Sequence, residues 1–415
     1  MSHPQLVEGE IRVLGPRWNP RVHAVKAFLA RSRVVYRWQE VDQPLAVHFP
    51  DGTTLSDPEV RDVAAHLGLD TEPDSRSYDL IIVGGGPAGL TAAINAASEG
   101  LRTIVVEQEV PGGQASYSAI VENYPGFPEG LSGGDLARRT VQQAERFGAE
   151  ILVTRRATGL RSDGTHHTVA LDMGADLLAE AVVISIGVTF RWLDAPGCAQ
   201  LVGAGIYYGA AIAEASACSN QDIYILGGGN SAGQAALLLS QYARRVFIVA
   251  LERSLEEMMA KYLVDRIRRL PNVVALTCHT VVRAEGEKFL ERLTLQNLDT
   301  GETRQVEASG LFVFIGATPR TEWLADTLAR DDQGFLLTGS SLPRDGNREL
   351  AWPLDRRPYP LETNRPGVFA AGDVRCGSVK RIAAAVGEGA MAVQLVHRYR
   401  REHAERAAVP GGGSS

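Results

Sequence analysis

The sequence predicts an α/β protein in which two Rossmann-like units follow a smaller α/β unit at the N-terminal end. Two glycine-rich turns, beginning at Gly84 and Gly227, each stand between a hydrophobic strand and a helix that leads to a second strand. Near the C-terminal end, another hydrophobic strand enters Gly372-Asp373 and then a helix. Because such turns bring backbone N–H groups at a helix N-terminus close to a phosphate, the pattern predicts dinucleotide binding.

Length and composition fit this fold class and argue against several kinds of partner. The 415 residues, 45% of them hydrophobic, suffice for two or three buried cores, and the net charge of −7 argues against nucleic-acid binding. No apolar run reaches the roughly 18 residues of a membrane span, and the start of the chain has no apolar signal-peptide core. The four cysteines lack disulfide-framework and metal-ligand spacing. We therefore expect a cytoplasmic protein without a metal or a membrane anchor.

Residues 1–70 form the smaller unit, in the order strand, helix, three strands, helix. "HAVKAFLARS" has helical spacing, with Val25, Phe28 and Leu29 on one face. The order resembles a shortened thioredoxin or glutaredoxin fold. The loop that would carry the Cys-x-x-Cys of that fold reads "RWNPRVH" and contains no cysteine.

The second half of this unit is predicted from turn and cap residues. "LAVHFPDGTTL" is typical of a hairpin that turns at Asp51-Gly52. The helix that follows is expected to have Asp57 as its N-cap and to end at Gly68. Residues 71–77 are polar and form a linker.

The first glycine-rich turn lies within "YDLIIVGGGPAGLTAAINAASEGLRTIVVEQ", which is typical of strand, turn, helix and second strand. Gly84, Gly86 and Gly89 fit G-x-G-x-x-G, and Glu107 ends the second strand at the spacing of an acidic ribose ligand. The alternative is a glycine-rich turn with a purely structural role. In that case the preceding strand, the following helix and the acid at this spacing would all occur together by coincidence. The stretch therefore predicts a dinucleotide site.

The second turn lies within "DIYILGGGNSAGQAALLLSQYARRVFIVALERS" and repeats this order. Gly227, Gly229 and Ala232 fit the same pattern, because a small third residue still allows the helix to pack closely on the strand. Glu252 and Arg253 follow the second strand. Two interpretations stay open, a working nucleotide pocket and a retained fold whose pocket binds nothing.

The third signature is "PGVFAAGDVRCGSVKRIAAAVGEGAMAVQLV", near the C-terminal end. Its strand runs into Gly372-Asp373 and then into a helix, whose positive N-terminal end would stabilise negative charge on a reduced flavin. Asp373 is suited to bind the ribitol hydroxyls of a flavin. The alternative for Asp373 is a plain cap at the entry of the helix.

These three signatures, in this order, resemble the low-molecular-weight thioredoxin reductase family of flavoproteins over about residues 78–405. The resemblance also rests on "VPGGQ", "VENYPGFPEGLSGGDL" and "VFIGATPRTEWL". It implies an FAD-binding domain in two parts, 78–192 and 311–405, with an NAD(P)-binding domain inserted at 193–310 and a flexible tail at 406–415. It also implies FAD, with NADH or NADPH, and a homodimer. The N-terminal unit lies outside the core family and looks like the mark of a fused subgroup.

Two sets of cofactor-binding residues follow from the motifs and the resemblance. The FAD set consists of the first glycine turn with its acid, three residues from loops that touch flavin in the family, and the surroundings of the third signature: Gly84, Gly86, Pro87, Ala88, Gly89, Glu107, Gly113, Gln114, Asn123, Gly372, Asp373, Arg381, Ile382 and Ala383. The nicotinamide set consists of Gly227, Gly229, Asn230, Ser231, Ala232, Glu252 and Arg253.

Two departures from the family pattern bear on function. The redox Cys-x-x-Cys of the family aligns with residues whose side chains accept no electrons: Gly209, Ala210, Ala211 and Ile212. The family's His-Arg-Arg, which clamps the 2′-phosphate of NADPH, aligns with Ala250-Leu251-Glu252. Glu252 would repel a phosphate and could accept a hydrogen bond from a free ribose 2′-OH, whereas Arg253 remains as a substitute clamp. NADH, NADPH and an empty pocket therefore all stay open.

Two cysteines and two tyrosines are further candidates for a role in the missing redox step. Cys218 and Cys376 are the thiols that could form a mixed disulfide or lie close to the flavin, and for each the alternative is a buried structural cysteine. Tyr207 and Tyr208 could line the space left by the dithiol, but interdomain packing is the favoured interpretation. Four further residues are interpreted as surface or capping residues: Glu388, His397, His166 and His167.

The sequence thus predicts an FAD-dependent oxidoreductase of thioredoxin reductase architecture that lacks the redox dithiol. Hydride from a nicotinamide nucleotide would reduce the flavin, which would then reduce a quinone, oxygen, a small electrophile or the disulfide of a partner protein. The alternative is a flavin-based redox sensor or docking module with negligible turnover, in which the N-terminal unit engages a partner.

Overall fold

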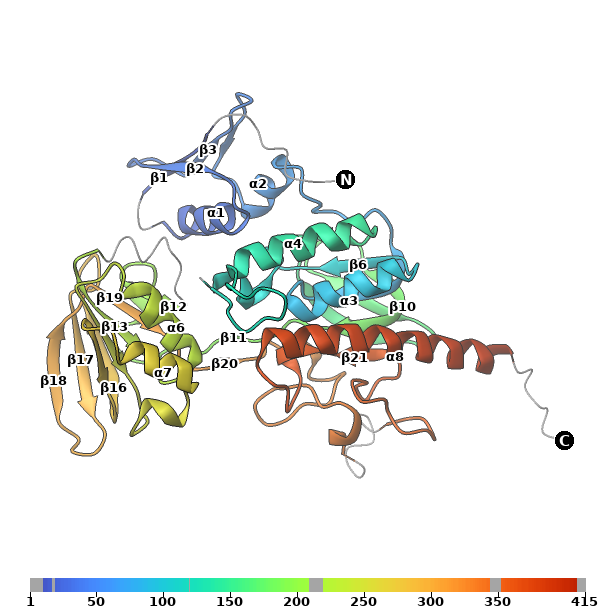
Figure 1. Cartoon of the computed structure of the whole chain (residues 1–415). Coiled ribbons are helices and arrows are strands. Elements are labelled where there is room, and N and C mark those ends of the chain that lie inside the picture. The colour runs from blue at the N-terminus through green and yellow to red at the C-terminus, as the bar shows by residue number, and fades with distance from the viewer. Residues whose placement is uncertain (1–9, 17–18, 119, 209–218, 344–351, 409–415) are drawn as a thin grey trace.

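The computed structural model of the chain describes residues 10–16, 19–118, 120–208, 219–343 and 352–408. Four sheets and a short connecting pair of strands make up the molecule, and the N-terminal sheet lies above the first large sheet in Figure 1. Helices flank the large sheets. The fold is therefore α/β, as the sequence predicts.

The N-terminal sheet has the strand order β2-β1-β3-β4, with β1 and β2 parallel and the other neighbours antiparallel. Its elements are β1 (Ile11–Gly15), α1 (Pro20–Arg31), β2 (Tyr36–Glu40), β3 (Ala46–His48), β4 (Thr54–Ser56) and α2 (Val60–His66). The helix α1 buries Val25, Phe28 and Leu29, which confirms its predicted inner face.

The predicted cap of α2 is wrong. Asp57 has a φ of 48°, whereas an N-cap adopts an extended backbone, and its carboxylate pairs with Arg21 of α1. The N-cap is Glu59, whose backbone N–H donates to the Asp62 carboxylate at 2.9 Å.

The first large sheet has the order β7-β6-β5-β10-β9-β8, and β21 also pairs with β10. Its strands are β5 (Ser77–Val83), β6 (Thr103–Val106), β7 (Glu150–Leu152), β8 (Ala157–Ser162), β9 (His167–Leu171), β10 (Leu177–Ile184) and β21 (Val368–Ala370). One face is covered by α3 (Pro87–Ser98), α4 (Gly133–Arg146) and α8 (Ile382–Ala408), as Figure 1 shows. The strand–helix–strand order of the sequence thus gives a Rossmann-type sheet whose central strands are parallel.

The second large sheet is fully parallel, in the order β12-β19-β13-β14-β15. Its elements are β12 (Ile206–Tyr208), β13 (Asp222–Leu226), α6 (Asn230–Leu239), β14 (Arg245–Val249), α7 (Lys261–Ile267), β15 (Val273–Leu276) and β19 (Gly310–Val313). An antiparallel sheet packs beside it, formed by β16 (His279–Glu285), β17 (Arg292–Asn297) and β18 (Thr303–Glu307). The short strands β11 (Thr189–Phe190) and β20 (Ala317–Thr318) pair antiparallel where the chain passes between the two large sheets (Figure 1).

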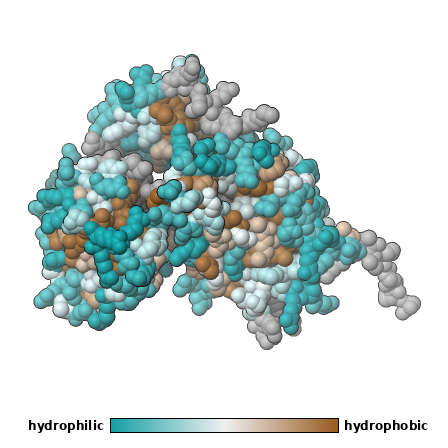
Figure 2. Space-filling model, in the orientation of Figure 1, coloured by the Kyte–Doolittle hydropathy of each residue, from teal (hydrophilic) through white to brown (hydrophobic). Residues whose placement is uncertain are grey.

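Burial differs from expectation at one of the paired histidines. His167, which the sequence suggests is a surface or capping residue, is only 3% exposed, because it is the first residue of β9, in which alternate residues point into the core. Hydrophilic residues cover most of the face shown in Figure 2, and hydrophobic ones form separate small patches. Within the described ranges, no helix has the length and apolar character needed to cross a membrane.

Candidate dinucleotide-binding sites

Three parallel strands of the first large sheet end at the same edge. In their register Val83 of β5 lies beside Ile184 of β10, which lies beside Ala370 of β21. The next residues therefore meet, although they come from distant parts of the chain. The Ser185 hydroxyl ties two of these ends together, since it donates to the carbonyl oxygens of Val83 and Gly84 at 3.2 and 2.9 Å.

The first glycine turn leaves space only on its outer side. Gly84 has a φ of 104°, and a Cβ built on it would lie 2.6 Å from the Ser185 carbonyl oxygen. A Cβ on Gly89 would overlap the carbonyl oxygen of Gly84, so α3 can approach the strand this closely only without a side chain there. Gly86, the N-cap of α3, has nothing within 4 Å of its Cβ position. The space beside Gly86 at the N-terminus of α3 is thus open, with Pro87 and Ala88 as the first helical residues.

Glu107 is buried at this turn and holds it in shape. One carboxylate oxygen accepts the N–H of Gly85 at 2.7 Å and the other accepts the N–H of Glu109 at 2.9 Å. Burial raises the pKa of Glu107, and the two hydrogen bonds oppose that rise. Each oxygen keeps a further lone pair, which is what a ribose hydroxyl would need.

The loop 109–117 lies across the turn. The Gly112 N–H donates to the Gly85 carbonyl oxygen at 2.7 Å, and a Cβ on Gly113, whose φ is 56°, would lie 3.1 Å from the Gly86 Cα. The side-chain amide of Gln114 donates to Val188 O at 2.6 Å, so this predicted flavin contact already has a protein partner. Asn123 is exposed, in the segment between the bridged residues Val121 and Leu131.

The third signature comes to the same place. A Cβ on Gly372 would lie 3.1 Å from the Ala88 side chain, and a Cβ on Gly389 of α8 would overlap the Ala88 carbonyl oxygen. Residues of the first turn and of the C-terminal signature are therefore in contact. Arg381 immediately precedes α8, and Ile382 and Ala383 form its first turn.

Glu388 is a site residue that sequence reasoning missed. Its carboxylate accepts the Gly372 N–H at 2.7 Å and pairs with the Arg375 guanidinium, so it fixes the loop after β21 from within α8. Asp373 in that loop is partly buried, which raises its pKa, and Lys380 donates to its backbone carbonyl oxygen at 2.7 Å. The feature of the sequence that could have revealed the role of Glu388 is an acidic residue on the helix that follows the Gly372-Asp373 loop.

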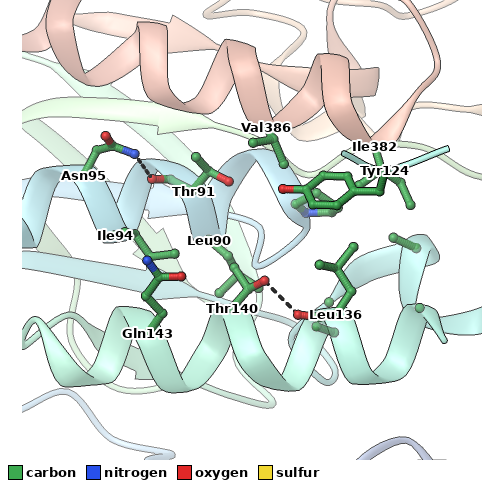
Figure 3. A pocket seen from close by; sticks show the side chains of 15 residues that line it. Leu90, Thr91, Ile94, Asn95, Tyr124, Leu136, Thr140, Gln143, Ile382 and Val386 are labelled. Atoms are coloured by element: carbon green, nitrogen blue, oxygen red, sulfur yellow. Dashed lines mark hydrogen bonds between the residues drawn. The ribbon is translucent and has the colours of Figure 1, made fainter. Parts of the chain in front are cut away.

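A cavity of about 330 Å³ lies among α3, α4 and the start of α8 (Figure 3). Its lining combines apolar side chains, such as Leu90 and Val386, with polar ones, such as Thr91 and Gln143, and Tyr124 points toward it. Among the predicted FAD residues only Pro87 and Ile382 belong to the lining: the glycines, Glu107 and Asp373 do not. The cavity therefore adjoins, through Pro87 and Ile382, the strand edge at which the first glycine turn and the Gly372-Asp373 loop meet.

The second turn repeats the geometry of the first. Gly227 has a φ of 136°, and a Cβ on it would overlap the Phe314 carbonyl oxygen. Gly229 is the N-cap of α6 and has nothing within 4 Å of its Cβ position. Ala232 is buried, in keeping with close packing of α6 on the sheet. A phosphate could therefore approach the N-terminus of α6 as it could that of α3.

The surroundings of four predicted nicotinamide residues bear on what the second turn could bind. A Cβ on Gly228 would overlap the Glu252 carboxylate, of which Oε2 is buried and has no hydrogen-bond partner among the described residues. Arg253 is mostly exposed and pairs with Asp299 at 3.0 Å, on the surface. Asn230 accepts the N–H of Ala260 at 2.7 Å, whereas Ser231 is exposed.

The candidates for the redox step divide into described and undescribed residues. Gly209, Ala210, Ala211, Ile212 and Cys218 lie outside the described residues. Partial burial raises the pKa of the Cys376 thiol, which disfavours the reactive thiolate. Tyr208 accepts the Leu193 N–H at 2.9 Å and Tyr207 packs against Phe312, which favours packing for both. No group of potential metal ligands occurs in the ranges that the structure covers.

Comparisons with known proteins agree with this geometry. The family model described as pyridine nucleotide-disulphide oxidoreductase matches residues 78–389. The chain is 36% identical over 322 residues to a thioredoxin reductase of Streptomyces clavuligerus, which covers 77% of this chain and 93% of that one. It is 33% identical over 338 residues to a bifunctional thioredoxin reductase/thioredoxin of Mycobacterium leprae, with coverages of 81% and 69%. The crystal structure of Lactococcus lactis thioredoxin reductase in its FR conformation superposes with a TM-score of 0.70 at 28% identity, covering 78% of this chain and 99% of that one.

Proposed function

Because the chain belongs to the pyridine nucleotide-disulphide oxidoreductase family and is of the thioredoxin reductase type, we propose that it is an FAD-dependent oxidoreductase that works without an internal dithiol. Bound FAD supplies the chemistry, in that it takes hydride from a nicotinamide nucleotide and passes electrons to an acceptor. The observation that carries the proposal is the meeting of the Gly84 turn, Glu107 and the Gly372-Asp373 loop at one strand edge.

The residues at this edge fit FAD. The N–H groups at the start of α3 would bind the pyrophosphate, in the open space in front of Gly86. Glu107 would accept from the ribose and Asp373 from the ribitol chain. The first turn of α8, which contains no acidic residue, would present its positive end to the flavin, with Gln114 and Asn123 on the loops nearby.

The acceptor lies outside the chain in this proposal. The sequence contains no Cys-x-x-Cys, and Gly209–Ile212 stand where the family carries it. Electrons would therefore leave for a quinone, oxygen, a small electrophile or the disulfide of a partner protein. The similarity to thioredoxin reductases supports the flavin chemistry and leaves the acceptor to be identified by assay.

NADH is the nucleotide that the second site would favour. The buried Glu252 Oε2 next to Gly228 could accept a ribose 2′-OH, and it would repel a 2′-phosphate. Arg253, the substitute phosphate clamp, is engaged by Asp299. Both observations point away from NADPH.

We further propose that residues 1–70 are a truncated thioredoxin-like domain, supported by the β2-β1-β3-β4 order with β3 antiparallel to β1. Residues 78–192 and 311–405 would form the FAD domain, around a nicotinamide domain at 193–310. The active form would be a cytoplasmic homodimer, as is typical of the family.

The test is reduction of the FAD-loaded protein by NADH, NADPH and dithionite, followed anaerobically by loss of the flavin absorbance. We expect NADH to reduce the flavin. We also expect the protein to consume NADH in the presence of one of the acceptors. If dithionite bleaches the flavin and neither nucleotide does, the proposed oxidoreductase function is wrong and a flavin-based sensor takes its place.

A further inference from the structure

Two arginines stand at the C-terminal end of α1, facing the first large sheet. Arg31 is the last residue of the helix, and Arg33 follows its cap with a φ of 56°. The N–H groups of Arg33 and Val34 donate to Ala30 and Leu29, which is a Schellman ending with arginine where glycine is usual. A non-glycine residue in this conformation costs energy, so its position invites a functional explanation.

Arg31 contacts the loop 109–117 at three points. Its guanidinium pairs with Glu109 and donates to Val110 O at 3.2 Å, and it lies over the Tyr117 ring at 4.7 Å. The Arg31 side chain is only 15% exposed, so water screens these contacts less than it would at an open surface.

Arg33 holds the element that follows the loop. It pairs with Asp135 at 2.5 Å and donates to the Ser132 hydroxyl at 3.0 Å. Ser132 is the N-cap of α4. The two arginines together span the loop and the start of the next helix.

The inner side of the same loop touches the glycine turn. The Gly112 N–H donates to Gly85 O, and the Glu109 N–H donates to Glu107. Glu109 therefore bonds the buried turn with its backbone and Arg31 with its side chain. The loop is held between the N-terminal unit and the first dinucleotide turn.

Apolar packing makes this attachment more than two ion pairs. Buried residues of α1, such as Phe28 and Leu29, belong to the same hydrophobic cluster as Leu80 of β5 and Leu90 of α3. Val110 of the loop packs against this cluster too. In Figure 1, α1 lies above the left end of α4.

We infer that the N-terminal unit is a clamp that holds the loop 109–117 over the first glycine turn and thereby slows the release of FAD. Arg31 and Arg33 are its positioning residues. The inference rests on the proposed placement of FAD at this turn. It gives the N-terminal unit a task that needs no redox cysteine of its own.

The test measures FAD release from the full-length holoprotein, by the fluorescence of free flavin after dilution. Arg31→Ala and Glu109→Gln should each release FAD about fivefold faster, the upper range for an ion pair of this exposure, and the double variant no faster than either alone. Arg37→Ala is the matched control, since Arg37 belongs to the same unit but pairs with Glu10. Its release rate should equal that of the wild type.

A second readout follows the loop itself. Backbone hydrogen exchange in 109–117 should accelerate in Arg31→Ala and Glu109→Gln and stay unchanged in Arg37→Ala. Glu109→Gln leaves the N-terminal unit intact, so it decides the matter if Arg31→Ala folds poorly. Unchanged release and exchange in Glu109→Gln would overturn the clamp. A Gly113→Val variant that binds FAD as tightly as the wild type would instead overturn the placement of FAD.

Discussion

The Glu388 carboxylate accepts the backbone N–H of Gly372 at 2.7 Å, so α8 fixes the loop that carries Asp373. Arg375 pairs with the same carboxylate. The loop after β21 thus has its shape set by a charged group on the next helix, and the position of Asp373 depends on it.

Glu388→Ala should lower FAD affinity about tenfold, because the loss of a charge-assisted hydrogen bond costs roughly 1.5 kcal/mol or more. Glu388→Gln keeps an acceptor for the Gly372 N–H, so its FAD affinity should lie between those of Glu388→Ala and the wild type. Titration of the apoprotein with FAD measures this. Gln394→Ala, on the same helix but bonded to Glu99, is the control and should bind as the wild type does. Equal affinity of Glu388→Ala and wild type would contradict the role of this contact.

The purified protein should be yellow and release FAD on denaturation, because the first glycine turn and the Gly372-Asp373 loop meet at one edge. Chromatography of the supernatant identifies the flavin. FMN, or no flavin even after incubation with FAD, would contradict the assignment of this edge.

The nicotinamide preference should depend on Glu252. A like-charge contact between its carboxylate and a 2′-phosphate costs about 1 kcal/mol or more at an effective dielectric constant near 20, so NADH should reduce the flavin at a lower concentration than NADPH. Leu251→Arg with Glu252→Arg should shift the preference toward NADPH.

Rapid-mixing reduction with each nucleotide measures this preference. Glu307→Arg, on β18, is a charge-reversal control away from the second glycine turn and should leave the preference unchanged. A wild-type protein that NADPH reduces faster and at lower concentration would mean that Arg253 acts as the clamp.

Thioredoxins should not be reduced through an internal dithiol, because the sequence has no Cys-x-x-Cys. An insulin-coupled assay with several thioredoxins is the measurement. Catalytic reduction that survives both Cys218→Ser and Cys376→Ser would show that electrons take another route.

Acid should destabilise the fold through His167. Burial lowers the pKa of His167 from 6.5 to about 4, so between these values the unfolded chain binds a proton that the folded chain does not. The stability is complete above pH 6.5 and falls as the pH drops toward 4, by roughly 3 kcal/mol. Urea unfolding at several pH values should show a shallower decline in His167→Gln than in the wild type. His166→Gln should follow the wild type, and an equal slope in all three would exclude this origin.

The sequence predicts the parts of the fold that depend on local pattern. The Rossmann-type architecture is confirmed, because the spacing of Gly84 and Gly227 to their strands and helices is itself the structural requirement. The inner face of α1 is confirmed for the same reason, since Val25 and Phe28 follow the helical period.

The side-chain contacts that the sequence does not reveal are those with partners in other elements of the chain. Asp57 is not the cap because its carboxylate pairs with Arg21. Glu388, which the sequence suggests is a surface or capping residue, binds the Gly372 N–H. The side-chain oxygen of Asn230 accepts a hydrogen bond from the Ala260 N–H. Each of these contacts joins two elements whose relative placement comes from tertiary packing, which no local periodicity encodes.

The pairing of β10 with β21 has a consequence for biosynthesis. Val182 of β10 pairs with Val368 of β21. Between the synthesis of these two residues, the ribosome translates all strands of the second large sheet, from Ile206 to Val313. Because the chain emerges from its N-terminal end, the insert is complete before its host. On the edge of β10 that later pairs with β21, β9 already pairs with Leu177–Ala179, but Val182–Ile184 stay without their β21 partners during that interval. The helix α8 is translated after β21. The edge at which the first glycine turn and the Gly372-Asp373 loop meet is therefore assembled only after β21 and α8 have been translated, so flavin binds late in the maturation of the protein.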